Sequence, residues 1–146
     1  MRRILLFTAL LVSLLWCKAQ PYGNEWIDYS QPHYKIKVWQ DGVYRIPYST
    51  LIAYSSSFSG INVNNFAIYH NGQQVPLFIS ATGSTLTGSD YIEFYGKRNI
   101  GDVDSFLYRT GDMQPHPYYS LFTDTSIYYL TIRSNQANLR LANVQN

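Results

Sequence analysis

The chain has 146 residues, of which 46% are hydrophobic, 16% aromatic and 14% charged, and its formal net charge is +2. This composition supports a packed core and excludes a disordered tail, while the length excludes a complete multidomain enzyme. We expect one modest domain that is rich in tyrosine, of which the chain has 14.

The first nineteen residues have the pattern of a secretory signal peptide. Two arginines precede an uncharged stretch at residues 4–16, and Ala19 ends a small-residue cleavage site. A transmembrane anchor is the alternative, but a span needs about 20 apolar residues and this stretch is shorter. A lipoprotein acylated at Cys17 is disfavoured because the bulky Trp16 precedes the cysteine. We therefore expect an exported protein, periplasmic, at the outer-membrane surface or secreted, with no transmembrane segment after cleavage.

Cleavage after Ala19 changes the charge balance. It removes Arg2, Arg3 and Lys18, which leaves eight basic residues against nine acidic ones. Because nucleic-acid affinity depends on clustered Lys and Arg, we expect no nucleic-acid partner. Cys17 is the only cysteine, so the mature domain is expected to have no disulfide, no zinc–thiolate site and no thiol nucleophile.

The mature chain begins with two strand-like segments. Residues 33–39 alternate in polarity and place Tyr34, Ile36 and Val38 on one face, which is typical of a half-buried strand. An Asp-Gly pair then leads to a second strand at 43–46. Because such a pair tolerates the positive φ of primed turns, we predict a hairpin.

One short helix is predicted next, at residues 47–54, with Ser49 or Thr50 as its N-cap and small polar residues at 55–60 ending it. After it, an Asn-Gly turn joins residues 66–70 to 73–79 in a second hairpin. Pro76 indicates that the second strand of this hairpin lies at an edge or a bulge.

The remaining elements alternate between loops and strands. A Gly/Ser/Thr loop at 81–89 leads to a strand at 90–95, with Ile92 and Phe94 on one face, and a long loop at 101–117 is interrupted by three apolar residues, 106–108. The last strand, 126–133, faces inward with Tyr128, Leu130 and Ile132. We predict an all-β domain at 20–133, an antiparallel β-sandwich or jelly roll with one short helical turn, followed by a polar tail or linker at 134–146.

No catalytic residue is assigned from the sequence. His33, His70 and His116 are the only imidazoles, and each is interpreted as a surface or loop histidine because none lies in a nucleophile motif. Asp90 and Glu93 are three residues apart on a strand, so they project to opposite faces and do not form a glycosidase pair.

An acidic loop offers one metal hypothesis. Asp102, Asp104 and Asp112 supply alternating oxygen ligands of the kind that begins a calcium loop, but the glycine and glutamate of an EF-hand are missing. A solvated acidic loop is the favoured interpretation, and no cofactor is expected.

Aromatic residues offer a contact hypothesis. Trp26, Trp39, Tyr118 and Tyr119 have the chemistry to stack on sugar rings, whereas tyrosines also pack on sheets and mark protein contacts. We favour core packing or an interdomain face. The residues assigned to an interdomain or glycan contact are Trp39, Tyr118 and Tyr119.

Several strings resemble the N-terminal region of gingipain-like cysteine peptidases, peptidase family C25, and more closely the sortase-like PorU proteins of the type IX secretion system. DYIEFYG at 90–96 is the most specific of them. The strings cover most of the mature chain in the expected order: YGNEWIDYS at 22–30, YKIKV at 34–38, DGVYRI at 41–46, GSDYIEFYGKRN at 88–99, PYYSLFTDT at 117–125 and YYLT at 128–131.

The resemblance implies an N-terminal β domain ahead of a caspase-like catalytic domain with a His/Cys dyad, which removes C-terminal secretion signals from cargo. No dyad residue is carried over to this chain, so we expect it to be non-catalytic and to pack against or support the downstream catalytic domain, with type IX secretion components as further partners. Its polar end is expected to reflect a fragment or a truncated product. The alternative functions are a free-standing secreted carbohydrate-binding β-sandwich and an inert gene remnant.

Overall fold

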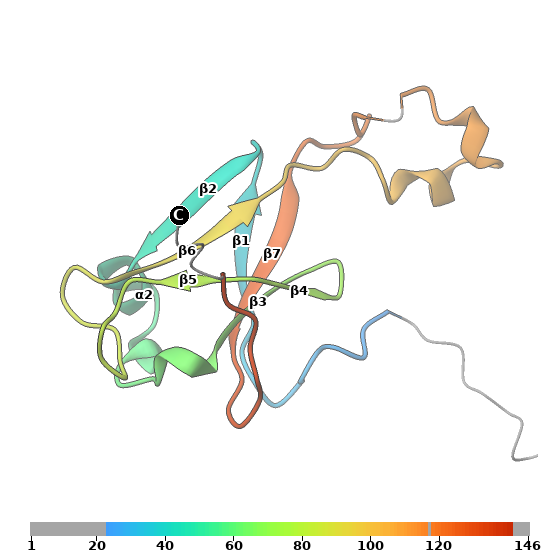
Figure 1. The fold of residues 1–146 in the computed structure, drawn as a ribbon. Coiled ribbons are helices and arrows are strands. Elements are labelled where there is room, and N and C mark those ends of the chain that lie inside the picture. Colours follow the sequence, from blue (N-terminus) through green and yellow to red (C-terminus); the bar gives the residue numbers. More distant parts are fainter. Residues whose placement is uncertain (1–22, 117, 142–146) are drawn as a thin grey trace, which may run out of the picture.

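The structure, a computed structural model, describes residues 23–116 and 118–141 (Figure 1). The expected signal peptide, its cleavage site and Cys17 lie outside the described residues. Within those two ranges, no helix has the length and apolar character that crossing a membrane requires.

Two antiparallel sheets form the domain, which confirms the predicted all-β, sandwich-like class. The four-stranded sheet has the order β1 (Tyr34–Val38), β7 (Ser126–Ile132), β3 (Phe66–His70) and β4 (Gln73–Val75). The three-stranded sheet has the order β2 (Gly42–Pro47), β6 (Tyr91–Gly96) and β5 (Phe78–Ile79). In the described residues one helix, α2 (Tyr48–Tyr54), accompanies four short 3-10 turns: η1 (Ser56–Phe58), η2 (Val63–Asn65), η3 (Asp104–Leu107) and η4 (Gly111–Met113).

The hydrophobic core lies between the two sheets. Alternation sends one set of side chains inward along β1, β6 and β7, which confirms the faces predicted for them, whereas four consecutive residues of β3 are buried. Leu51 of α2 and Phe58 of η1 also belong to the core. Burial of these apolar side chains is the main stabilising term of the fold. The fully buried strand residues include Val38, Phe66, Ile68, Ile92, Phe94 and Leu130.

The first predicted hairpin is wrong. Both strands form, but β1 pairs with β7 and β2 pairs with β6, so the turn between them carries the chain from one sheet to the other. A primed two-residue turn needs positive φ, and neither Asp41 nor Gly42 adopts it. The Asp41 carboxylate accepts a hydrogen bond from the backbone N–H of Arg98 at 2.8 Å, which ties this turn to the end of β6.

The second predicted hairpin is confirmed at its turn, but its predicted second strand at 73–79 is wrong, because only residues 73–75 pair with β3 as β4. Asn71 and Gly72 have φ values of 47° and 77°, as a type I′ turn requires, and they join β3 to β4. β4 is the outer strand of its sheet, as Pro76 predicted. The chain then crosses to the other sheet, where β5 pairs with β6.

The predicted helix is confirmed as α2, but its predicted N-cap is wrong. Pro47 occupies the N-cap position without a side-chain hydrogen bond, and the backbone N–H of Tyr48 donates to the Asp90 carbonyl oxygen at 2.8 Å. Strand β2 ends at Pro47 and the helix begins at Tyr48, so neither Ser49 nor Thr50 lies at the N-cap position. Ser55 ends the helix, its N–H donating to the Leu51 carbonyl.

Asp90 and Glu93, which were not expected to form a glycosidase pair, each have a separate structural partner. The Asp90 carboxylate accepts hydrogen bonds from the N–H and the hydroxyl of Thr87, which closes the turn before β6. These bonds lower the pKa of the Asp90 carboxyl, the backbone bond most strongly. Glu93 lies on the sheet face and pairs with Arg45 across the strands, at 2.7 Å.

After β7 the regular strand pattern ends, but the chain stays hydrogen-bonded to the domain. Leu77 donates its N–H to the carbonyl of Leu139 and accepts from the N–H of Leu141, which forms a short parallel bridge. The described part of the predicted tail, residues 134–141, therefore runs along the segment between β4 and β5.

Candidate functional site

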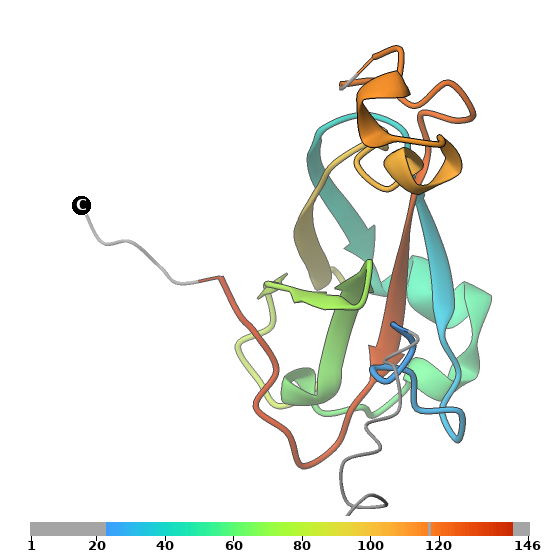
Figure 2. The same cartoon turned by 90° about the vertical axis from the view of Figure 1, so that its right-hand side faces the viewer.

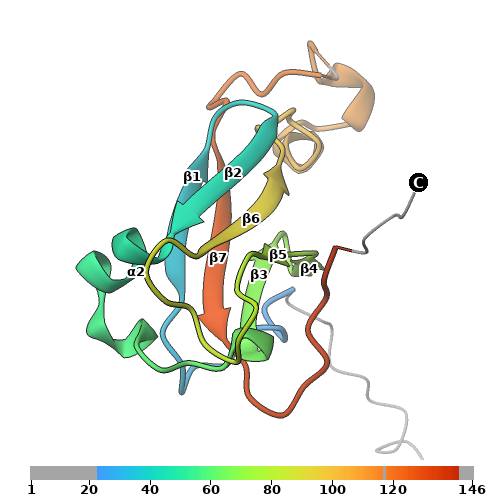
Figure 3. The same ribbon diagram turned by 60° about the vertical axis from the view of Figure 1, so that its left-hand side comes forward.

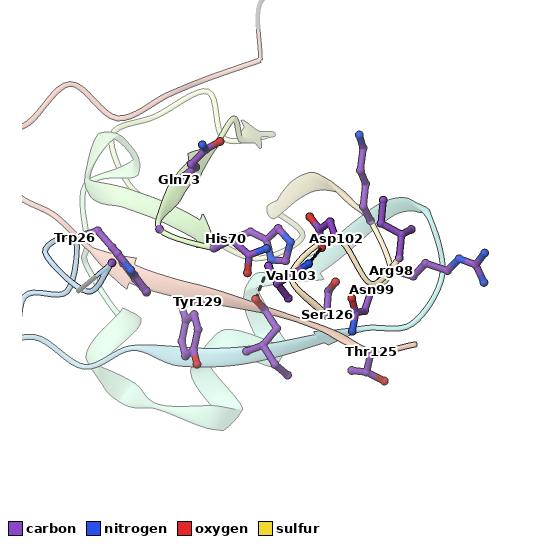
Figure 4. Close-up of a pocket in the computed structure, with 16 residues that line it drawn as sticks. Trp26, His70, Gln73, Arg98, Asn99, Asp102, Val103, Thr125, Ser126 and Tyr129 are labelled. Atoms are coloured by element: carbon purple, nitrogen blue, oxygen red, sulfur yellow. Dashed lines mark hydrogen bonds between the residues drawn. The ribbon is translucent and has the colours of Figure 1, made fainter. Parts of the chain in front are cut away.

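A groove with a cavity volume of about 650 Å³ lies at one end of the four-stranded sheet (Figure 4). We call it the polar groove. Its walls come from Trp26 in the N-terminal segment, the β3–β4 turn, residues 97–103 after β6, and residues 125–129 at the start of β7. Figure 4 shows Trp26 at one end, Arg98 and Thr125 at the other, and His70 between them.

Trp26 forms the aromatic end of the polar groove by packing on the outer face of the sheet. Its ring stacks on Tyr69, with centroids 4.9 Å apart and an interplanar angle of 22°, and also contacts Tyr129. A Cβ atom on Gly72 would lie 3.2 Å from Trp26 Cδ1, so the glycine of the turn allows this close approach. Trp26 therefore packs on the sheet and presents only part of its ring to the groove.

His70 lies in the middle of the polar groove, where the sheet holds it firmly. Its ring stacks on Tyr128 with centroids 4.2 Å apart and an interplanar angle of 8°. Its Nδ1 lies 3.1 Å from the carbonyl oxygen of Ile127. Ser126 and Asp102 also line the groove, but within the described residues no hydrogen bond joins either side chain to His70. The stacking on Tyr128 and the contact with Ile127 fix the orientation of the His70 ring in the groove.

The basic end of the polar groove comes from Lys97 and Arg98. The Arg98 guanidinium lies 4.3 Å from the centre of the Tyr119 ring, a cation–π contact. The other two histidines are engaged elsewhere: His33 contacts Trp26 edge-on, and His116 accepts a hydrogen bond from the N–H of Tyr118. The groove thus offers donors and cations for a polar or anionic ligand.

The acidic residues considered for calcium are not gathered. Asp102 and Asp112 are exposed, whereas Asp104 is buried in η3, where its Oδ2 has no hydrogen-bond partner. Among residues 23–116 and 118–141, no group of three or more His, Cys, Asp or Glu side chains is placed to hold a metal ion. The expectation that no cofactor binds here stays a prediction, whereas the buried Asp104 differs from the solvated loop that was predicted.

The three residues assigned to a contact role are all exposed, but they come from two separate segments. Trp39 follows β1, is 55% exposed and contacts Tyr44 edge-on. Tyr118 and Tyr119 lie in the connection between β6 and β7. His116 and Arg98 both pack on Tyr119, which is 48% exposed, whereas Tyr118 is 67% exposed.

The exposed apolar residues extend beyond the predicted Tyr118 and Tyr119 over a longer segment, which we call the aromatic loop (residues 100–116 and 118–122). It projects beyond the ends of the two sheets (Figure 2). Phe106 is 89% exposed and Leu107 is 66% exposed in its first half, and Phe122 is 65% exposed in its second half. The available signal was the large apolar residues in a segment that lacks strand alternation. The exposed apolar and aromatic residues are Ile100, Val103, Phe106, Leu107, Met113, Tyr118, Tyr119, Leu121 and Phe122.

Hydrogen bonds brace the aromatic loop from within. At its neck the N–H of Asn99 donates to the Asp124 carbonyl at 2.8 Å, and the Asn99 side-chain amide donates to the Thr123 carbonyl at 3.0 Å. The Gln114 amide donates to the carbonyl of Gly101 at 2.9 Å. Gly101 has φ 79°, and a Cβ atom there would lie 3.1 Å from the backbone of Tyr119, so a glycine is required at this crossing.

No family model, curated protein or solved structure matches this chain.

Proposed function

We propose that this chain is the non-catalytic, exported β domain of a gingipain-like cysteine peptidase of the type IX secretion system. In this proposal it supports the catalytic domain of the same parent protein by docking through the aromatic loop. The observation that carries the docking role is the exposure of large apolar side chains on a loop that hydrogen bonds hold in shape.

The energetics favour a protein partner for the aromatic loop. Transfer of a large apolar side chain from water to a packed interface contributes roughly 1.5–3 kcal/mol. Phe106, Leu107 and Phe122 are each more than half exposed, so docking would remove much of their apolar surface from water. Because the neck and the Gln114 bond already order the backbone, docking loses less conformational entropy than ordering a flexible loop would.

A supporting role also agrees with how the polar side chains are used. His70 is stacked on Tyr128, and Arg45 is paired with Glu93, so both contribute to the structure of the sheets. The catalytic His/Cys pair of the proposed parent would be supplied by another domain.

Carbohydrate binding is the second candidate, because Trp39 and Tyr118 are exposed aromatic rings. It is less favoured because Trp39 and Tyr118 come from separate segments, and Arg98 and His116 pack on the third candidate ring, Tyr119. Retention on a polysaccharide column that Trp39→Ala or Tyr118→Ala abolishes would support it over docking.

The first experiment measures the size of the native product with an antibody raised against residues 20–146. We expect a band far larger than 16.9 kDa in the envelope or secreted fractions, because the domain belongs to a longer peptidase. A band at or just below that mass would overturn the proposal.

The second experiment tests docking by limited chymotrypsin digestion of the native parent and of the isolated 20–146 chain. Chymotrypsin cleaves after large apolar residues, so the isolated chain is expected to be cut at Phe106, Leu107 or Phe122, whereas the docked loop is protected. A parent carrying Phe106→Ser and Phe122→Ser should lose this protection at the remaining sites. The matched control is Val43→Ser, an exposed apolar residue on the three-stranded sheet. Equal cleavage of parent and isolated chain would contradict docking by the loop.

A further inference from the structure

The two sheets are open along one edge, where β1 and β2 lie. Each is the outer strand of its sheet and has one pairing neighbour, β7 for β1 and β6 for β2. Joined at their turn, the two strands separate towards α2 (Figures 1 and 3). An outer strand leaves a row of backbone N–H and C=O groups available to another strand.

An apolar groove of about 340 Å³ lies between these two strands, and we call it the edge groove. It is distinct from the polar groove and from the aromatic loop, none of whose residues line it. Lys35 and Arg45 contribute to its lining, but most of the lining residues belong to the core or pack against it. They include Ile36, Tyr44, Ile46, Leu51, Phe58 and Leu130.

The charge along the β1 edge indicates the occupant. Lys35 and Lys37 are exposed on the outward face of β1, opposite the neutral residues Tyr129 and Ile127 of β7. The Arg45–Glu93 ion pair lies on the other sheet, and among residues 23–116 and 118–141 no ion pair to Lys35 or Lys37 is found. Both cations therefore remain available to a ligand that lies along β1.

These observations disfavour a second copy of the chain as the occupant. Pairing of β1 with β1 would bring Lys35 and Lys37 of one chain close to the same lysines of the other, and like charges across a strand pair are destabilising. Strand β2 is a less suitable acceptor for an acidic segment because Glu93 already neutralises Arg45.

We propose that the β1 edge binds an extended peptide segment in which apolar and acidic residues alternate, by β-strand addition. Side chains alternate between the two faces of a strand, so the apolar residues enter the edge groove while the acidic ones lie beside Lys35 and Lys37. Main-chain hydrogen bonds to β1 supply affinity, and the lysines supply selectivity. This inference is independent of the proposed function.

The test uses fluorescein-labelled ten-residue peptides and the 20–146 chain in a fluorescence anisotropy titration. A peptide that alternates valine with glutamate is expected to bind, and one that alternates valine with lysine is expected to bind at least about tenfold more weakly, because two favourable charge contacts become repulsive. The double variant Lys35→Glu, Lys37→Glu should reverse this preference. Lys97→Glu is the matched control, because Lys97 is exposed and lines the polar groove, and it should leave the preference unchanged.

Amide hydrogen exchange locates the bound peptide. The proposal expects new protection at backbone amides of β1, with that of β2 unchanged. It is overturned if the valine–glutamate peptide does not bind, if both peptides bind equally, if the double variant behaves like the unaltered chain, or if protection appears only in β2. Self-association that occupies β1 in sedimentation experiments would also overturn it, in favour of a second copy.

Discussion

Gly96 provides a test of how closely the two sheets approach. A Cβ atom built on Gly96 in β6 would lie 2.9 Å from Cδ2 of Tyr44 and 3.0 Å from Cγ1 of Val38. Val38 belongs to the four-stranded sheet and Gly96 to the three-stranded one, so the missing side chain allows the sheets to meet beside the β1–β2 turn. Its backbone φ is not positive, and a substitution there therefore tests space and not backbone strain.

Gly96→Ala is expected to destabilise the domain by about 1–3 kcal/mol, the usual cost of adding a methyl group to a filled core. For a domain of this size the melting temperature should fall by roughly 3–5 °C for each kcal/mol. The matched control is Gly42→Ala, because Gly42 pairs directly with Gly96 across β2 and β6 and a Cβ atom there meets nothing within 4 Å. That variant should be neutral, or stabilised by up to about 1 kcal/mol through reduced freedom of the unfolded chain.

Urea unfolding of the 20–146 chain, followed by tryptophan fluorescence, compares the two variants. The reasoning is refuted if Gly96→Ala is as stable as Gly42→Ala, since the sheets would then be farther apart than the structure places them.

Three further predictions follow from single side chains. Tyr128→Phe removes the hydroxyl that accepts the N–H of Lys97 at 2.8 Å, and urea titration should show a loss of about 1–3 kcal/mol. Burial raises the pKa of Tyr128 above its ordinary value of about 10, so as pH rises this hydroxyl ionises in the unfolded chain before it ionises in the folded one. The free energy of unfolding should therefore fall as pH rises above about 10. Tyr128→Phe should lack this part of the pH dependence. Hydrogen bonds from Thr87 lower the pKa of Asp90, so the stability that this carboxylate contributes should be lost as pH falls below about 4. Asp90→Asn should reduce this pH dependence of the melting temperature. Phe106→Ala should change the free energy of unfolding by less than about 0.5 kcal/mol, since the side chain is 89% exposed, and a larger loss in urea would show that the aromatic loop packs on its own domain.

The candidate sites were only partly visible in the sequence. Trp39, Tyr118 and Tyr119 were expected to be exposed, and they are, but the packing of Arg98 and His116 on Tyr119 joins residues up to 21 positions apart and leaves no pattern in the chain. The edge groove was hidden for a related reason: its lining comes from β1, β2, α2 and β7, and a groove between strands exists only once their pairing partners are fixed.

Local patterns in the sequence predicted the buried faces of several strands and one of the turns, although they misplaced the N-cap of the helix. Alternation predicted the buried faces of β1, β6 and β7, and the Asn71-Gly72 pair predicted a turn whose positive φ both residues adopt at little cost. Tertiary structure decided which strands pair. The Asp41-Gly42 turn is locally compatible with a hairpin, yet β1 and β2 pair with β7 and β6, because those pairings let the inner faces of both strands bury against one core from opposite sheets. Pairing between distant segments depends on the total apolar surface removed from water, which is a property of the whole chain and not of any local pattern.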